Sequence, residues 1–271
     1  MMNNIIEKIQ KETGYNFIRI MIMFYHDKLK YGISLQEFYD YKFYKIKKSL
    51  KHTFLTKKDN HKLIKKYNSK LENYKIKNRN ILYSIFNEYI KREYFIIDDK
   101  NLLEFESFLK GKRQITVRKI NGMESETISL SNVKTKQLYM TLFNTNVRLA
   151  EEHMLEHSEY NKFYLKNDFL ITFIVINEQV VLKTMKAKGI HYNIEDGKFK
   201  NKKIPFLNEL EELSIKMFKD LDNLNYLYFE YFVSTEGIEL ISINDNVPIL
   251  QNSEALYNEC GYKEKLKKYM E

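Results

Sequence analysis

Residues 226–244 read YLYFEYFVSTEGIELISIN, and this stretch decides the fold class. Residues 226–233 and 238–243 are rich in β-branched and aromatic side chains, which favour strands. The turn residues at 234–237 lie between them, so the stretch predicts an antiparallel strand pair. Glu230 lies inside the first strand, where a buried carboxylate costs free energy unless it is paired or coordinated. Alternation along the strand leaves both a core-facing and a solvent-facing Glu230 open.

Polar side chains follow the second strand of this pair. Residues 241–248 read ISINDNVP, so that Asn244 and Asp245 come directly after an apolar run. Carboxylate and amide oxygens, together with phosphate oxygens, are the ligands that Mg²⁺ prefers. Glu230, Asn244 and Asp245 are therefore the candidate metal ligands. The alternative is an ordinary polar turn before a proline.

Further strands and helices are predicted upstream and downstream. Strands are expected over residues 114–119, 126–130, 169–176 and 179–186, and helices over residues 208–221 and 254–270. Lys119 ends the first of these strands, shortly before the turn residue Gly122. A lysine beside a glycine turn can place its ammonium on a phosphate that backbone N–H groups surround. The alternative is a solvated lysine at a strand end.

The first 112 residues predict helices. Ser34 and Glu37 have the spacing of a capping box, and apolar residues recur at helical intervals in residues 81–92 and 101–110. Helices followed by antiparallel hairpins indicate an α+β fold rather than a doubly wound parallel sheet. We expect a helical region over residues 1–100 and a second region over residues 101–271.

Composition excludes several classes of protein. The chain has 271 residues and a single cysteine, Cys260, which excludes an internal disulfide framework and a cysteine-based zinc site. No apolar run approaches the roughly 20 residues that a membrane-spanning helix needs. The N-terminal residues lack the pattern of a secretory signal, so we expect a cytoplasmic protein.

The net charge of +9 is unevenly distributed along the chain. Residues 1–100 carry 22 Lys and Arg against 11 Asp and Glu, whereas residues 101–271 carry 23 against 25. The basic excess indicates either a solvated face or contact with a polyanion or an anionic surface. Binding of nucleic acid by this third of the chain is an alternative function, but no recognition motif supports it.

An acidic pair and two histidines occur in residues 148–157, RLAEEHMLEH. Glu151 and Glu152 are either an ordinary carboxylate pair on a helix or strand edge, or part of a binding site. His153 and His157 lie four residues apart, which on a helix would place both on one face. No third ligand accompanies them, so zinc is the weaker interpretation.

The order of these features resembles a known family. A lysine on an early strand, then an acidic pair, then a late hairpin with an acid on its first strand and an asparagine ending its second, is the plan of ATP-grasp proteins. From about residue 25 to residue 248 the chain is similar to the sugar-transfer-associated ATP-grasp proteins found with bacterial surface-polysaccharide genes. The similar segments are YGISLQEFYDYKFY (31–44), YSIFNEYIKREYF (83–95), ITVRKINGMESETISL (115–130), EEHMLEH (151–157), KIPFLNELEEL (203–213) and residues 226–244.

The resemblance implies an ATP-grasp fold in which β-containing subdomains of residues 101–271 clasp a nucleotide. It implies ATP and Mg²⁺ as cofactors, with Lys119, Gly122, Glu151 and Glu152 at the nucleotide. It also implies an ATP-dependent carboxylate–amine ligase in cell-surface polysaccharide biosynthesis. The substrate would be an unidentified carboxylate or sugar-linked compound, and glycan-biosynthesis proteins would be partners. No catalytic residue is assigned.

Three motifs depart from the family pattern. Ser242 stands where the family has a metal-binding glutamate, and Leu170 stands where it has an arginine. Glu124, Ser125 and Glu126 stand where further glycine is expected after Gly122. Asp245 could substitute for the missing carboxylate. These departures favour an alternative function, a catalytically inactive pseudoenzyme that serves as a binding or scaffold partner.

Overall fold

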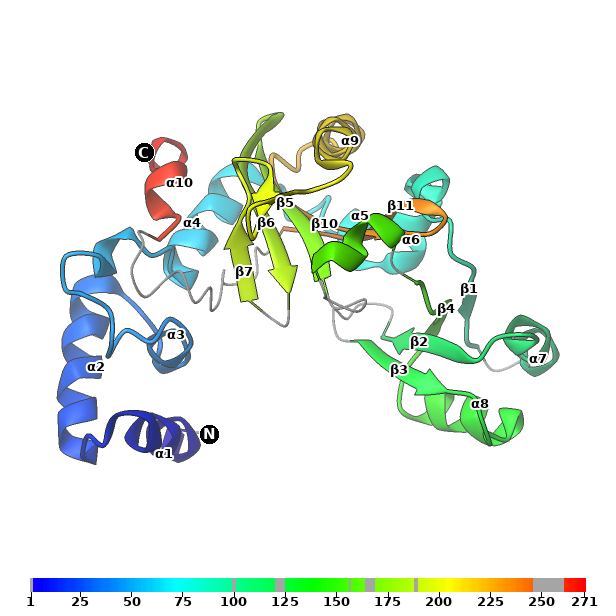
Figure 1. Ribbon diagram of the computed structural model, residues 1–271, viewed down its shortest axis with the longest axis horizontal. Helices are drawn as coiled ribbons and strands as arrows, with labels where there is room; N and C mark the ends of the chain where they lie inside the picture. Colours follow the sequence, from blue (N-terminus) through cyan, green and yellow to red (C-terminus); the bar gives the residue numbers. More distant parts are fainter. Residues whose placement is uncertain are drawn as a thin grey trace. The chain divides into compact units, whose positions relative to one another are not determined.

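The computed structural model describes residues 2–98, 101–119, 125–155, 157–163, 169–187, 190–245 and 261–271. Gly122 and the first part of the helix expected over residues 254–270 lie outside these ranges. Helices dominate the N-terminal part and antiparallel strands the remainder, which confirms the α+β class (Figure 1). Among the described residues, none of the helices combines the length and the apolar character needed to cross a bilayer.

The chain divides into two compact units. Unit 1 comprises Met1–Lys70, Asp168–Tyr228 and Asp245–Glu271, and unit 2 comprises Leu71–Asn167 and Phe229–Asn244. This division does not fall at the boundary expected between residues 100 and 101. The reason is that helices from the first 100 residues pack in both units, so that secondary-structure content does not mark where contacts become sparse.

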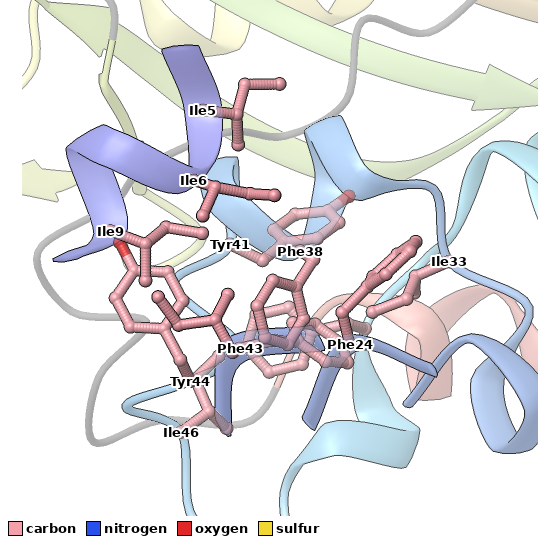
Figure 2. Packing of buried hydrophobic residues seen from close by; sticks show 12 residues of the cluster. Ile5, Ile6, Ile9, Phe24, Ile33, Phe38, Tyr41, Phe43, Tyr44 and Ile46 are labelled. Carbon is pink, nitrogen blue, oxygen red and sulfur yellow. The ribbon is translucent and has the colours of Figure 1, made fainter. Parts of the chain in front are cut away.

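The N-terminal helices of unit 1 surround a core of their own. They are α1 (Met2–Thr13), α2 (Phe17–Tyr31) and α3 (Leu35–Asp40). Figure 2 shows the side chains that they bury together, among them Ile5, Ile9, Phe24, Phe38 and Phe43. Aromatic rings meet edge to face, as in Phe24 and Phe38 with centroids 5.6 Å apart, a geometry that aromatic quadrupoles favour.

The predicted capping box of α3 is confirmed. The Ser34 side chain accepts from the Glu37 backbone N–H at 3.2 Å, and Glu37 Oε2 accepts from the Ser34 backbone N–H at 2.7 Å. The second Glu37 oxygen accepts from the backbone N–H of Lys57, at the start of α4 (Lys57–Tyr67). One carboxylate therefore stabilises the first turns of two helices, which explains why Glu37 is buried.

The remainder of unit 1 is built on a sheet. The structure contains the strands β5 (Phe169–Ile176), β6 (Gln179–Ala187), β7 (Ile190–Asn193), β8 (Lys198–Phe199) and β9 (Lys202–Lys203), with 3₁₀ turn η1 (Lys51–Thr53) and helices α9 (Leu207–Lys219) and α10 (Lys263–Met270). The hairpin of β5 and β6 was predicted within one residue at each end. Helix α10 packs on α4 and β6, and its Leu266 is fully buried.

Unit 2 has its own sheet, with the strand order β1-β4-β2-β3. It contains α5 (Tyr74–Lys77), α6 (Arg79–Ile85), η2 (Asn87–Tyr89), β1 (Tyr94–Ile96), α7 (Leu102–Leu109), β2 (Gln114–Arg118), β3 (Ser125–Ser129), α8 (Thr135–Asn144), β4 (Leu149–Glu152) and η3 (Ser158–Phe163). Helices α7 and α8 pack against this sheet through Phe105, Leu138 and Leu142. The helix predicted over residues 81–92 ends at Ile85, because Phe86 leaves the helical region.

The decisive hairpin consists of β10 (Tyr226–Ser234) and β11 (Gly237–Asn244), as predicted. It continues a sheet with the order β11-β10-β5-β6-β7. Every residue of β10 is buried, which a strand covered on both faces requires. Exposed and buried positions therefore do not alternate along this strand, and Glu230 is buried.

Capping of α3 yields a stability prediction. We expect Ser34→Ala to lower the free energy of unfolding by about 1 kcal/mol, because an N-cap acceptor is lost. The exposed turn residue Ser49 lies in the same unit, and Ser49→Ala should change it by less than about 0.5 kcal/mol. Urea unfolding followed by circular dichroism measures both; equal effects would contradict the capping argument.

A buried histidine yields a second prediction. His191 of β7 is 2% exposed, its Nδ1 lies 3.0 Å from Thr184 Oγ1, and burial, followed by the charge of Lys186, lowers its pKa from 6.5 to about 3. Unfolding lets this imidazole take a proton below pH 6.5, so stability is lost as pH falls from 6.5 toward 3, with a slope approaching ~1.4 kcal/mol per pH unit. His191→Gln should remove that slope from unfolding curves measured at pH 4 to 7. Superimposable slopes for the two proteins would contradict this.

Candidate functional site

Glu230 and Asn244 are joined by hydrogen bonds within unit 2. Ser242 of β11 donates its hydroxyl to Glu230 Oε2 at 2.5 Å, and Asn244 Nδ2 donates to Ser242 Oγ at 2.9 Å. Glu230 is 5% exposed and Ser242 is 3% exposed, so the structure places the Glu230 carboxylate in the interior. We call these three residues the hairpin chain. It forms because β10 and β11 are neighbours and Ser242 and Asn244 share one face of β11.

The hairpin chain offers oxygen atoms to a hard cation. The Glu230 carboxylate accepts from Ser242, and carboxylate oxygens are of the type that coordinates a hard cation. Asn244 uses its Nδ2 toward Ser242, which leaves Oδ1 as the side-chain atom able to coordinate. Oxygen donors of this kind fit Mg²⁺, which keeps several water molecules and takes phosphate oxygens. The set differs from the predicted one of Glu230, Asn244 and Asp245, because the hairpin chain contains the neutral hydroxyl of Ser242 and not Asp245.

The other predicted site residues lie at separate positions. Asp245 directly follows β11 and is buried, but it belongs to unit 1. Lys119 follows β2 and is exposed, so its ammonium is accessible to a ligand. Glu152 is half-buried at the end of β4, where its Oε2 accepts from the backbone N–H of Glu93. The hydrogen bonds of the hairpin chain thus unite two of the predicted metal ligands, and Lys119, Glu152 and Asp245 are not members of it.

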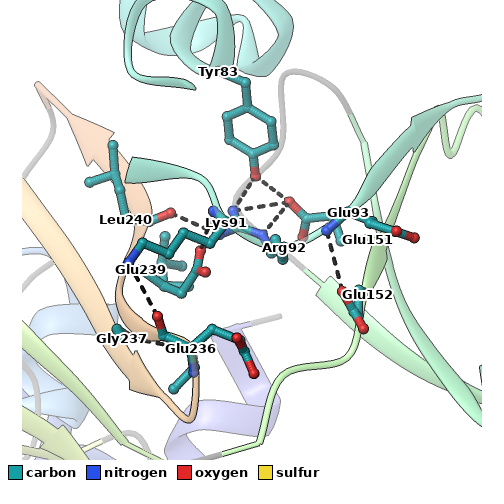
Figure 3. A network of polar contacts seen from close by, with 12 residues as sticks. Tyr83, Lys91, Arg92, Glu93, Glu151, Glu152, Glu236, Gly237, Glu239 and Leu240 are labelled. Atoms are coloured by element: carbon teal, nitrogen blue, oxygen red, sulfur yellow. Dashed lines mark hydrogen bonds and ion pairs between the residues drawn. The ribbon is translucent and has the colours of Figure 1, made fainter. Parts of the chain in front are cut away.

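Glu151 lies at the centre of a buried ionic cluster in unit 2, and Figure 3 shows its contacts with Tyr83 and Arg92. Arg118 Nε donates to Glu151 Oε2 at 2.6 Å, and Arg92 Nη2 donates to Oε1 at 3.2 Å. The Tyr83 hydroxyl donates to the same Oε1, and it accepts from Arg92 at 2.6 Å. The full cluster, which we call the Glu151 cluster, consists of Arg79, Tyr83, Arg92, Arg118, Glu151 and Glu239.

The cluster fixes the charge of Glu151. Burial alone would raise the pKa of this carboxyl, but the positive charges of Arg92, Arg118 and Arg79 outweigh burial and lower the pKa from 4.5 to about 2. Glu151 therefore contributes stability that is fully present above pH 4.5 and is lost as pH falls toward 2. Both of its oxygens bind protein groups, which gives the side chain a structural role. Its assignment to the nucleotide stays a prediction.

The same cluster holds the strand that carries Ser242 and Asn244. Arg92 donates to Glu239 at 3.0 Å and to the backbone carbonyl of Leu240 at 3.0 Å. Arg79 donates to the carbonyl of Ile241 at 2.9 Å. These bonds tie β11 to the first residue of α6, Arg79, and to the segment before β1, which supplies Arg92. They therefore set the position of the backbone immediately before the hairpin chain.

Sequence reasoning missed the arginines. The chain has six arginines among 45 basic residues, and three of the six lie in the Glu151 cluster. Arginine keeps its charge when buried and binds carboxylates through a planar fork of donors, which lysine does not. In a chain that otherwise uses lysine, the few arginines were a signal of buried ion pairs.

His153 and His157 do not lie on a helix, so the arrangement on one helical face that was considered for them is not found. Strand β4 ends at Glu152, so His153 and His157 follow a strand rather than sharing a helical face. His153 Nδ1 lies 3.4 Å from Thr116 Oγ1. Across the described ranges, His, Cys, Asp and Glu do not gather in groups of three or more that could hold a metal ion.

Comparisons with solved structures establish the fold. The ATP-grasp ligase PsnB, complexed with a minimal precursor, Mg and ADP, has a TM-score of 0.54 at 11% identity, over 75% of this chain and 60% of PsnB. The D-alanine–D-alanine ligase from Bacillus anthracis, complexed with ATP, has a TM-score of 0.50 at 12% identity, over 71% of this chain and 62% of the ligase. No protein-family model and no curated protein sequence matches the chain.

These similarities show that the chain has an ATP-grasp fold, which confirms the fold predicted from the order of the motifs. At such identities they show the fold alone. The chain spans about 60% of the length of the PsnB structures. Substrate and pathway therefore stay outside what the similarity shows.

The Glu151 cluster yields a prediction with a control in the next residue. Glu151→Gln should lower the free energy of unfolding by roughly 3–5 kcal/mol, because it leaves Arg92 and Arg118 buried without their anion. Glu152→Gln keeps an acceptor for the Glu93 N–H and should cost less than about 0.5 kcal/mol. Guanidinium unfolding at pH 7 separates the two. Comparable losses would show that the ion pairs are not what stabilises unit 2.

Proposed function

We propose that this ATP-grasp fold binds Mg²⁺·ATP through unit 2 and acts as an ATP-dependent ligase. The observation that carries the proposal is the hairpin chain, in which Glu230 and Asn244 lie within one set of hydrogen bonds on the last two strands. Solved ATP-grasp ligases with this fold were obtained with ATP, or with ADP and Mg. The oxygen donors of the hairpin chain are of the type that such a complex requires.

Each residue has a defined task in this proposal. Glu230 and Asn244 would hold the cation through Oε and Oδ1 atoms, and bound Mg²⁺ would neutralise charge on the phosphates. Lys119 would place its ammonium on the same phosphates, since it is exposed at the end of β2. Glu152 and the residues after it would lie along the nucleotide base. Asp245, which belongs to unit 1, stays a predicted ligand outside this proposal.

The proposed reaction joins a carboxylate to an amine. A substrate carboxylate attacks the γ-phosphoryl group of ATP and releases ADP, and an amine then displaces phosphate from the acyl phosphate. Most of the rate enhancement in phosphoryl transfer comes from positioning and charge neutralisation. The Glu151 cluster supports positioning, because it fixes the backbone of β11 next to Ser242.

The resemblance of individual segments to surface-polysaccharide ATP-grasp proteins extends the proposal to the substrate of the ligase. Segments such as residues 31–44 and 203–213 are similar to proteins of bacterial surface-polysaccharide biosynthesis, which favours a sugar-linked or other carboxylate substrate. PsnB was solved with a precursor peptide, so a peptide is the acceptor to test beside it. Release of phosphate from ATP in the presence of each acceptor class would distinguish them.

A pseudoenzyme is the second candidate, and Ser242 favours it. A neutral hydroxyl replaces a carboxylate in the hairpin chain and is used to bind Glu230. The loss of one charged ligand weakens the binding of Mg²⁺. Phosphoryl transfer depends strongly on this cation, whereas binding of the nucleotide depends on it less. Binding of Mg²⁺·ATP without phosphate release under any acceptor would identify this alternative.

Calorimetry tests the proposal. We expect the native chain to bind ATP in the presence of Mg²⁺, and Lys119→Ala to raise the Kd about tenfold or more, since ~1.4 kcal/mol of binding free energy corresponds to a factor of ten. Lys136→Ala, at an exposed position of α8, is the matched control and should leave the Kd unchanged. Absence of binding at millimolar ATP would refute the proposed function.

A further inference from the structure

Helix α2 (Phe17–Tyr31) has two apolar faces, and only one of them is buried. Its inner face places Ile20 and Phe24 in the N-terminal core. Its outer face exposes Ile18 (67%), Ile22 (65%), Tyr25 (53%) and Leu29 (87%). These four residues are spaced by four, three and four positions, so they form one continuous stripe along the helix. Single exposed apolar residues are ordinary, whereas a continuous stripe marks an interaction surface.

The charged residues beside the stripe have one sign. The other exposed residues of α2 are Phe17, Arg19, His26, Lys28 and Lys30. The one acidic residue of the helix, Asp27, is 1% exposed and bonds Lys51 at 2.6 Å, so it adds no negative charge to the outer face. We call the stripe and these basic residues together the outer face of α2. It is apolar and basic throughout.

The basic stems lie against aromatic rings of the same segment. Arg19 stacks on Tyr15 with its guanidinium carbon 3.7 Å from the ring centroid, and the Lys28 and Lys30 ammonium groups lie 5.8 and 5.4 Å from the rings of Phe24 and Tyr31. Long cationic side chains of this kind cover apolar surface with their methylene groups and keep their charge at the boundary with water. The face therefore has an apolar centre and cationic margins.

Helix α2 is capped at both ends and held in place by contacts within the chain. The Asn16 side chain accepts from the Arg19 backbone N–H at the start of the helix, and Gly32 ends it in the left-handed conformation with φ of +74°. The Asp27–Lys51 ion pair and the buried Phe24 fix its rotation about its own axis. The outer face therefore lies on a helix that is already formed, so its binding needs no folding step.

Charge decides which partner such a face fits. A second copy of the chain would bring Arg19, His26 and Lys28 against the same basic residues, with no exposed acid on α2 to pair with them. An anionic lipid surface satisfies both properties, because apolar side chains enter the headgroup boundary by about 5–10 Å while lysines stay at the phosphates. Residues 1–70, which belong to the same unit as α2, carry 16 Lys and Arg against 6 Asp and Glu, and this excess adds long-range attraction.

We propose that the outer face of α2 is a docking surface for anionic phospholipid bilayers, with the helix lying in the plane of the headgroups. This would hold the chain at a membrane surface independently of nucleotide binding. Ile22 and Leu29 supply the apolar contact, and Arg19, Lys28 and Lys30 supply the attraction to lipid phosphates. The proposal does not depend on the proposed ligase function, because the residues concerned take no part in it.

Co-sedimentation of the full chain with vesicles tests the proposal. We expect binding to vesicles of phosphatidylcholine with phosphatidylglycerol, weakening as salt rises from 50 to 500 mM or so, and at least tenfold weaker binding to phosphatidylcholine alone. Ile22→Glu with Leu29→Glu should reduce binding to the anionic vesicles at least tenfold. Lys28→Glu with Lys30→Glu should reduce both the binding and its dependence on salt.

The control variant is Leu103→Glu, which places the same charge on another exposed apolar residue, 77% exposed in α7. It should bind the vesicles as the native chain does, and circular dichroism should show that all variants are folded. Equal binding of the Ile22/Leu29 and control variants, equal binding to neutral vesicles, or no binding at low salt would each overturn the proposal. So would a native dimer that Ile22→Glu converts to monomers, because it would assign the face to self-association.

Discussion

The buried carboxylate of Glu151 is the interaction on which unit 2 depends. A charge removed from water at this depth is stable only if opposite charges and hydrogen bonds replace its hydration. Arg92 and Arg118 supply opposite charge and hydrogen bonds, Tyr83 supplies a further hydrogen bond, and the arginine charges lower the pKa of the Glu151 carboxyl against the effect of burial. Because these partners come from β2 and from segments around α6 and β1, satisfying one carboxylate joins several elements.

This constraint extends to the candidate site. Arg79 and Arg92 also bond the backbone of β11, one and two residues before Ser242. The hairpin chain then follows on the last residues of the strand, where Ser242 connects Glu230 to Asn244. The Glu151 cluster contacts one part of β11, and the hairpin chain lies on the next part. The groups that hold this strand in place are therefore distinct from the candidate metal ligands.

The chain uses its two kinds of cation differently. Arginine is rare, and three of the six arginines are buried in the Glu151 cluster, where Arg92 and Arg118 bond carboxylates and Arg79 bonds the Ile241 carbonyl. Lysine is abundant and mostly solvated, with an excess in the first 100 residues. Among the lysines of the described ranges, Lys51 is buried, and it pairs with Asp27 of α2. Because this pair buries Asp27, the one acid of α2, the charged side chains on the outer face of the helix are all basic.

Local features were determined by the sequence alone. The capping box of Ser34 and Glu37, the hairpin at residues 169–186 and the final strand pair follow from hydrogen-bonding groups and β-branched residues within a few positions of each other. The fold class, and the ATP-grasp plan inferred from motif order, follow from the succession of such elements. These properties need no knowledge of distant contacts.

Only the tertiary structure decided the orientation and pairing of individual side chains. Glu230 could face either way until a sheet buried every position of β10. Glu151 and Glu152 are chemically equal neighbours, yet one is the centre of an ionic cluster and the other lies half-exposed, because alternation turns them to opposite faces of β4. Which face is buried depends on arginines 33 to 72 positions away, and a local pattern carries no information about partners at that distance.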